Sequence, residues 1–451
     1  MDNFKKTWIN LLLAVACFLP LFGQGDFNLP QKKSDKIKFK LVGNLIVIPV
    51  ELNGVELSFI LDSGVSKPIL FNITNTDSLQ IKNVEKIFLR GLGEGGQPVE
   101  ALKSRKNFFK LGNALNINQD IYVVFDNSIN FTSRLGVNVH GIIGYDIFKS
   151  FVVEINYISK YIKLHEPELY TYKSCRKCET FDLSLYNNKP YIEAEVEVDK
   201  GSIPVKLLID TGSSDALWLF EDHDIGLKPF ENRYFDDFIG KGLSGNVYGK
   251  RSKVKSFKLK SFELDNVNVA FPDSSSISTA RLIKNRNGSM SGELLKRFNL
   301  IFDYKRAKLV LKKNGNFKAS FYYNRSGIIL EQTGSRIVKE KEDRGLTGYG
   351  NRGGEGTQID LNTYYRFALK PFYSIVELRP NSAAASVGLK VGDIVVSVNG
   401  KQSHNLKLQQ IMEYFKNDVG KLIRLKIDRD GELLSFQFRL EDVFNQKKLP
   451  K

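Results

Sequence analysis

The sequence predicts a mainly β fold in which one unit occurs twice and a smaller β-rich unit follows. An apolar stretch with the composition of a buried strand precedes each of two Asp-Ser/Thr-Gly triplets, which begin at Asp62 and Asp210. A glycine, a phenylalanine and an Asn/Asp-Tyr pair follow in both halves. The spacing of 148 residues from Asp62 to Asp210 is the same as that from Gly144 to Gly292. The two halves are therefore copies of one unit.

Each copy supplies one carboxylate, Asp62 or Asp210. Two carboxylates that face each other across a pseudo-twofold axis cannot both ionise cheaply, so one pKa rises and the other falls. Such a pair combines an acid with a base and can activate a water molecule.

The residues after each aspartate fit such a site. Ser63 and Thr211 carry hydroxyls that can hydrogen-bond to the facing loop, and Gly64 and Gly212 allow backbone N–H groups to approach the carboxylates. One triplet alone is typical of a simple turn. Two copies in matched context favour a shared function.

Residues 35–315 resemble the aspartic proteases, in particular the duplicated retropepsin-like proteins that bacteria export. Asp-Thr-Gly-Ser at 210–213, with Ser213 in the last place, matches the catalytic motif of that family. The turn at 144–148 matches its second motif. In the first copy Val65 stands where the family has a small residue, so this copy departs from the motif.

The resemblance implies two pepsin-like β-barrel lobes, at 35–168 and 181–315, related by a pseudo-twofold axis and joined by a linker at 169–180. It also implies an aspartic-type endopeptidase in which Asp62 and Asp210 activate water for attack on a peptide bond of a peptide or protein substrate. No metal or other cofactor is expected. Because both aspartates lie in one chain, the resemblance implies a monomer.

Glycine-rich runs follow each aspartate at a similar distance. Gly91 and Gly93 mark the first run, and Gly240 and Gly242 mark the second. Neither run ends in the Lys-Ser/Thr of a phosphate-binding loop. We therefore expect two hairpins that close as flaps over an extended substrate.

The last third of the chain, 321–445, resembles a PDZ domain of the bacterial type. The resemblance rests on an apolar strand at 373–378 and on Gly-Leu-Lys-Val-Gly-Asp-Ile at 388–394. It implies a groove, lined by a helix at 408–415, that binds a peptide or the C-terminus of a protein.

The loop that captures the chain end is expected at Gly327, Ile328 and Ile329, whose backbone N–H groups would bind a terminal carboxylate. The charged, glycine-rich segment 331–370 follows this loop. We expect it to be an insertion or a flexible loop.

Residues 1–24 have the layout of a signal peptide, with two lysines, an apolar run and then Gly-Gln-Gly across the expected cleavage region. Export to the bacterial periplasm or cell envelope is therefore expected. Cys17 stands in a weak lipoprotein-like context, which leaves a lipid anchor as an alternative. The net charge of +16 is compatible with association with an anionic envelope surface, or simply with a solvated basic face. No nucleic-acid-binding module is recognisable, so nucleic acid is not an expected partner.

Cys175 and Cys178 lie in the connection between the two copies. A Cys-x-x-Cys pair can be a redox centre, half of a zinc site or a small disulfide loop. The four histidines show no metal-ligand spacing, so no metal is expected, and an oxidising compartment favours the disulfide.

Two other functions stay open from the sequence. The first is a catalytically silent peptide-binding scaffold, which Val65 and the weaker turn at 292–295 favour. The second is a thiol-disulfide protein acting through Cys175 and Cys178, which lacks the thioredoxin-like context that this chemistry needs.

Overall fold

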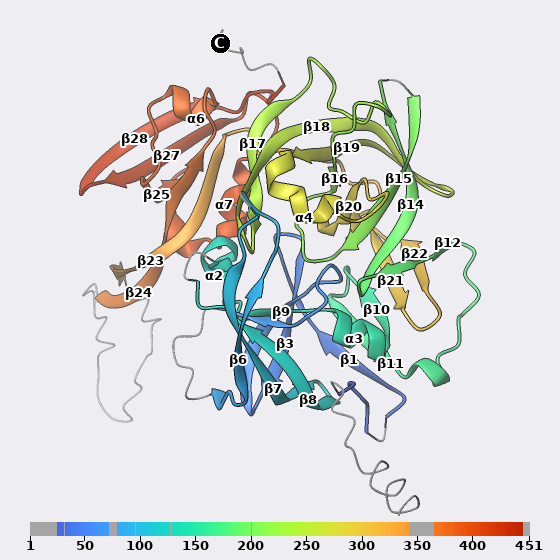
Figure 1. Cartoon of the computed structure of the whole chain (residues 1–451). Coiled ribbons are helices and arrows are strands. Elements are labelled where there is room, and N and C mark those ends of the chain that lie inside the picture. The colour runs from blue at the N-terminus through green and yellow to red at the C-terminus, as the bar shows by residue number, and fades with distance from the viewer. Residues whose placement is uncertain are drawn as a thin grey trace, which may run out of the picture.

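The computed structural model describes most of the chain. The described ranges are 25–30, 32–71, 79–94, 96–126, 129–199, 201–341 and 365–444. The fold is mainly β, as predicted (Figure 1). The expected signal peptide at 1–24 lies outside these ranges. Within them, no helix has both the length and the apolar character needed to cross a membrane.

The first lobe is an eight-stranded sheet in the order β2-β3-β4-β9-β5-β8-β7-β6, and an additional β3–β7 pairing closes it into a barrel. Its strands are β2 (Lys40–Val42), β3 (Leu45–Leu52), β4 (Val55–Leu61), β5 (Ile69–Leu70), β6 (Val84–Leu89), β7 (Val99–Leu111), β8 (Ala114–Val123) and β9 (Gly141–Ile143). Two short helices flank β9 in the sequence, α2 (Phe131–Leu135) and α3 (Tyr145–Ser150).

The second lobe repeats this topology strand for strand, in the order β13-β14-β15-β20-β16-β19-β18-β17 with a closing β14–β18 pairing. Its strands are β13 (Ser184–Tyr186), β14 (Lys189–Val198), β15 (Gly201–Asp210), β16 (Leu217–Leu219), β17 (Phe235–Gly242), β18 (Gly245–Leu259), β19 (Phe262–Pro272) and β20 (Gly288–Ser291). Its helices are η3 (Ser274–Ile277), α4 (Ser278–Arg281) and α5 (Gly292–Leu295). The two predicted lobes and their pseudo-twofold relation are confirmed.

A six-stranded sheet joins the lobes, in the order β1-β11-β10-β21-β22-β12. Its strands are β1 (Ser34–Lys38), β10 (Val152–Asn156), β11 (Tyr161–His165), β12 (Cys178–Asp182), β21 (Phe298–Asp303) and β22 (Lys308–Lys313), and η2 (Pro167–Leu169) lies in the connection. At its centre β10 of one copy pairs antiparallel with β21 of the other. The rings of Phe148 and Phe302 pack edge to face beneath it, with centroids 4.9 Å apart, so that one hydrophobic core continues through both lobes.

The C-terminal domain has a core of its own. Its sheet runs β23-β24-β25-β27-β28, with β26 paired to β25. The strands are β23 (Ile328–Lys341), β24 (Tyr365–Leu378), β25 (Ile394–Val398), β26 (Lys401–Gln402), β27 (Leu422–Arg429) and β28 (Glu432–Arg439), and the helices are α6 (Ala383–Ser386), η4 (Ser403–Asn405) and α7 (Leu408–Tyr414). Figure 1 shows this domain packed against the β17–β18 hairpin of the second lobe.

The segment 331–370, expected as an insertion or flexible loop, begins and ends in regular structure. β23 and β24 form one long antiparallel ladder, from Ile328 opposite Leu378 to Lys341 opposite Tyr365. Residues 342–364 lie outside the described ranges. Beyond Gln332 the ladder exposes side chains on both faces, so its sequence lacks the alternation of apolar and polar residues that identifies a half-buried strand.

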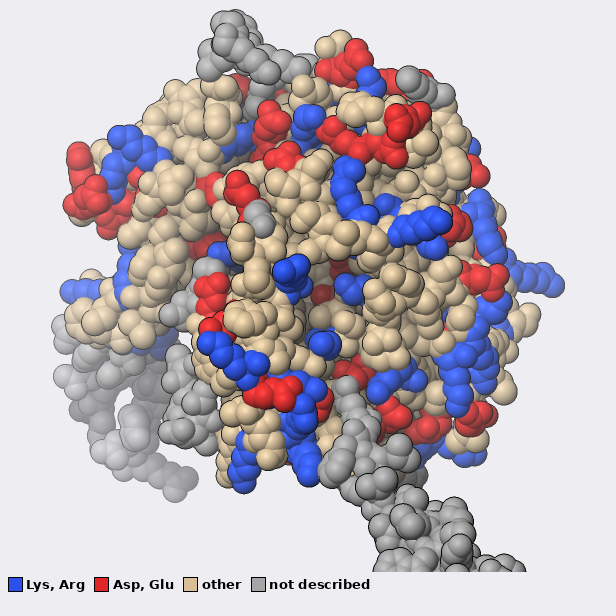
Figure 2. Space-filling model, viewed as in Figure 1, with Lys and Arg blue, Asp and Glu red and all other residues tan. Residues whose placement is uncertain are grey.

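Cys175 and Cys178 form a disulfide at the start of β12, whose first residue is Cys178. Figure 2 shows Lys and Arg side chains interspersed with Asp and Glu over the face that it displays, rather than gathered in one band.

Candidate active site

Asp62 and Asp210 occupy equivalent places in the two barrels. Asp62 follows β4, and Asp210 is the last residue of β15. Each of these strands pairs in parallel with the short strand that precedes the second repeated motif, β9 or β20. In both loops a glycine two residues on donates its backbone N–H to the aspartate Oδ1, at 2.7 Å from Gly64 and 3.0 Å from Gly212.

A crossed set of hydrogen bonds holds the two loops together. The N–H of Ser63 donates to Thr211 Oγ1 (2.9 Å), and the N–H of Thr211 donates to Ser63 Oγ (3.1 Å). Each hydroxyl in turn donates across the interface, Ser63 to the carbonyl of Ile209 (2.6 Å) and Thr211 to that of Leu61 (2.7 Å). Both side chains are buried, so these bonds are shielded from competing water.

Gly212 is required for space, and Gly64 lies in a tight contact. A Cβ on Gly212 would lie 2.1 Å from Cγ of Asp62, and a Cβ on Gly64 would lie 3.3 Å from Cγ of Asp210. Each carboxylate therefore rests against the glycine of the opposite loop, which brings the two acids side by side.

The proximity and burial of the acids change their protonation. Burial, and then the negative charge of Asp210, raise the pKa of Asp62 to about 7. Burial also raises the pKa of Asp210, against the opposing effects of Arg286, the Gly212 N–H and Lys189, so both pKa values rise and the expected fall of one of them does not occur. The pair therefore retains a proton from acid to near-neutral pH.

The two expected flaps are hairpins whose tips contact each other. The N–H of Ser244 donates to the carbonyl of Leu92 (2.9 Å), and the N–H of Gly91 donates to Ser244 Oγ (3.1 Å). A Cβ on Gly242 would lie 2.1 Å from the Leu92 carbonyl oxygen, so the close approach needs glycine there. Gly240 is not at the tip: it lies within β17, next to an irregularity in its pairing with β18.

One continuous cavity of about 1240 Å³ contains both aspartates, the hairpin tips and residues of the C-terminal domain. It also reaches β23 and α7, between which a PDZ domain binds peptide. The site at the dyad and the groove of the third domain therefore open into the same space.

The expected chain-end loop lies at the start of β23, and much of its hydrogen bonding is internal. Gly327 adopts φ +83°, and its N–H donates to Asn324 Oδ1 (3.3 Å). The N–H of Ile328 donates to Ser326 Oγ (3.0 Å). Ile329 lines the cavity. A terminal carboxylate would have to replace these internal acceptors.

Helix α2 of the first lobe lies at the groove, beside β23 and α7 (Figure 1). Arg134 Nε forms an ion pair with Glu331 Oε1 at 2.8 Å, and Gln409 Nε2 donates to the carbonyl of Leu135 at 2.5 Å. The protease-like lobe thus covers part of the surface on which a peptide would bind.

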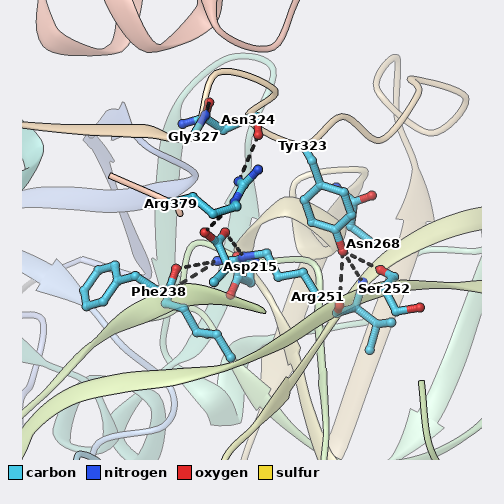
Figure 3. Close-up of polar contacts among 12 residues, drawn as sticks. Asp215, Phe238, Arg251, Ser252, Asn268, Tyr323, Asn324, Gly327 and Arg379 are labelled. Carbon is cyan, nitrogen blue, oxygen red and sulfur yellow. Dashed lines mark hydrogen bonds and ion pairs between the residues drawn. The ribbon is translucent and has the colours of Figure 1, made fainter. Parts of the chain in front are cut away.

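A chain of ion pairs connects the third domain with the second lobe (Figure 3). Arg251 lies between Asp215 (3.0 Å) and Asp237 (2.8 Å). Burial disfavours the charge of Arg251, but these two carboxylates outweigh it and raise its pKa. Arg379 of the third domain then contacts Asp237 (3.1 Å) and donates to the carbonyl of Asn324 (3.1 Å). The chain-end loop is thereby connected with the segment that follows Asp210.

Comparison with known families agrees with this arrangement. A family model described as aspartyl protease matches residues 48–147 and 194–290, and a PDZ domain model matches residues 374–429. The chain carries a duplicated aspartyl protease domain and a PDZ domain. No curated protein matches it. The two protease matches contain Asp62 and Asp210, and the PDZ match begins within β24, so that it leaves out β23 and the expected chain-end loop.

Sequence reasoning missed two cations that line the protease cleft, Lys189 and Arg286. The register of the β14–β15 hairpin was the available signal, because continuing it two residues beyond the Tyr191–Leu208 pair sets Lys189 opposite Asp210. Nothing local in the sequence indicates Arg286, nor the docking of α2 on the PDZ groove.

Replacing Thr211 by Val should destabilise the protease domain by about 2–4 kcal/mol, because the buried Ser63 N–H and Leu61 carbonyl lose their partners. The midpoint of urea unfolding measures this. Thr211→Ser is the matched control, since serine fills the equivalent position 63 and keeps both bonds. Equal midpoints for the two variants would contradict the structural role of the hydroxyl.

Replacing Asp62 by Asn should remove the loss of folding stability that this carboxyl group causes as the pH rises. The folded pKa of about 7 exceeds the ordinary value of 3.8, so this group's stabilising contribution is complete below pH 3.8 and is lost as pH rises through 7. The melting temperature of Asp62→Asn minus that of the parent protein should therefore increase between pH 4 and 7 and level off above. A difference that does not vary with pH would contradict the raised pKa.

Proposed function

We propose that the protein is an aspartic endopeptidase that hydrolyses peptide bonds with a water molecule activated by Asp62 and Asp210. The observation that carries this proposal is the pair of coupled carboxylates, held side by side by the crossed Ser63–Thr211 bonds. The hairpin tips above the cavity provide cover for an extended substrate.

In this mechanism Asp62 carries the shared proton and Asp210 is ionised. Asp210 takes a proton from water while the oxygen attacks the carbonyl carbon, and Asp62 gives its proton to the carbonyl oxygen. The tetrahedral intermediate then collapses: the C–N bond breaks, the proton on Asp210 passes to the leaving nitrogen, and a proton of the intermediate returns to Asp62. Water is consumed and the dyad is restored.

The PDZ domain is proposed to bind a peptide or protein chain end along β23. As an edge strand, β23 can pair with an added strand, and Ile329 and α7 line the adjoining cavity. The proposed place of action is the bacterial cell envelope or periplasm. This rests on the leader-like residues 1–24, and the Cys175–Cys178 disulfide supports it.

Asp210→Asn should lower peptide cleavage by roughly 10²–10⁴-fold, because it removes the base of the dyad. The measurement is kcat/KM on a diverse peptide mixture between pH 3 and 9, with and without a pepstatin-like inhibitor. The parent protein should lose activity above a pH of about 7, where Asp62 releases the shared proton. Asp265→Asn, an exposed acid on β19, is the control and should keep full activity.

Undiminished cleavage by Asp210→Asn would contradict the proposed mechanism. No cleavage by the parent protein, together with retained peptide binding, would support the silent scaffold instead.

Arg134→Ala should expose the PDZ groove by removing the ion pair with Glu331. Since both side chains are largely covered, binding of peptides with free C-termini should tighten by about two- to fivefold. Fluorescence anisotropy with a library of labelled peptides, each as free acid and amide, measures this. Lys86→Ala, which breaks the exposed Lys86–Glu100 pair of the same lobe, is the control. Unchanged affinity in Arg134→Ala would show that α2 does not compete with peptide.

A further inference from the structure

Two cations face the dyad from the second lobe. Lys189 and Arg286 both line the cavity that holds Asp62 and Asp210, and both are partly buried. The mechanism above assigns neither of them a role.

The position of Lys189 follows from the hairpin that carries Asp210. β14 and β15 pair with Tyr191 opposite Leu208, and the same register continued by two residues sets Lys189 opposite Asp210. The turn before β14 has two asparagines with positive φ, 48° and 64°, which is the pattern of a tight hairpin that fixes where the strand begins. Burial and the charge of Arg286 lower the pKa of Lys189, whereas the two dyad carboxylates raise it.

Arg286 is held in place by neutral partners. Its Nε donates to the carbonyl of Gly288 (3.2 Å) and its Nη2 to Ser289 Oγ (2.9 Å), and its guanidinium lies 5.2 Å from the centre of the Phe220 ring. Among the described residues, neither Arg286 nor Lys189 forms an ion pair with a carboxylate within 4.0 Å.

The first lobe has apolar residues at the equivalent positions. In the β3–β4 hairpin, Val47 lies opposite Ile60, so the same register sets Leu45 opposite Asp62. Val139 precedes His140, whose N–H donates to the carbonyl of Ser58 (2.8 Å).

Val139 corresponds to Arg286. Asn287, the residue after Arg286, makes the same bond to the carbonyl of Lys206 (2.9 Å). At these two pairs of equivalent positions the second lobe is therefore basic and the first lobe is apolar.

The charges in the cleft are unequal. A dyad that keeps one proton carries one negative charge, whereas Lys189 and Arg286 together carry two positive charges. The charge of the dyad offsets only one of these two positive charges. A partly buried cation without a counterion is costly, and a carboxylate of the bound substrate would supply the missing counterion.

We propose that Lys189 and Arg286 form a carboxylate-binding subsite, which selects substrates with an acidic side chain or a chain-terminal carboxylate beside the scissile bond. This proposal rests on the proposed peptidase function. The ammonium of Lys189 is a compact, strongly hydrated charge, whereas the guanidinium of Arg286 presents a planar fork of N–H donors. Together they can bind both oxygens of one carboxylate.

The test uses matched peptides with blocked ends that carry Glu or Gln at each position around the cleaved bond, and a second series as free acid or amide. The parent protein should prefer the acidic partner by about tenfold in kcat/KM, from a charge-assisted contact. Lys189→Leu, which copies Leu45 of the first lobe, should reduce this ratio to near one, mainly through KM. Lys206→Leu is the control, because Lys206 belongs to the same hairpin but lies outside the cavity lining.

The outcomes separate this inference from the proposed function. A preference for Glu over Gln shows that the subsite binds a side-chain carboxylate, and a preference for the free acid alone shows that it binds the terminal carboxylate. Either preference supports the subsite if Lys189→Leu abolishes it. Cleavage with no acidic preference overturns the subsite and leaves the peptidase intact. If nothing is cleaved, anisotropy with the same peptides decides: tighter binding of the acidic peptide that requires Lys189 supports the subsite although the peptidase fails, and equal binding overturns it.

Discussion

The structure depends on one buried contact, the reciprocal hydrogen bonding of Ser63 and Thr211. Each residue uses its backbone N–H and its hydroxyl on the opposite lobe, so neither loop can shift without leaving buried polar groups unpaired. The β10–β21 pairing already joins the lobes at the core, and the crossed bonds join them again at the cavity where the two acids lie. The carboxylates are held close together although their charges repel.

Much of this site could be predicted from sequence because its determinants are local. Asp, hydroxyl and glycine follow one another in the chain, and the duplication repeats them at constant spacing. The two hairpins could also be predicted from local sequence, because glycines occur where the tips come into van der Waals contact. The tip of the second hairpin is at Leu243 and Ser244, beyond the predicted Gly240, because β17 continues two residues past that glycine.

The features that were missed depend on pairing between distant segments. The β23–β24 ladder reads as a loop because its outer part exposes both faces and has no apolar alternation. The contact of Arg134 with Glu331 joins residues 197 apart, and that of Arg379 with Asp237 joins residues 142 apart. The spacing of residues in the sequence does not reveal such contacts, because they form when folded domains pack against each other.

Having both lobes in one chain frees them from being identical. A symmetric dimer of a single unit would present the same residue on each side of its pair of aspartates. A bound peptide could then lie in either direction with equal contacts. Here Leu45 and Lys189 occupy equivalent positions and differ in charge. The two sides of the cleft are therefore chemically different. The cleft can distinguish the N-terminal from the C-terminal side of a peptide bound across it.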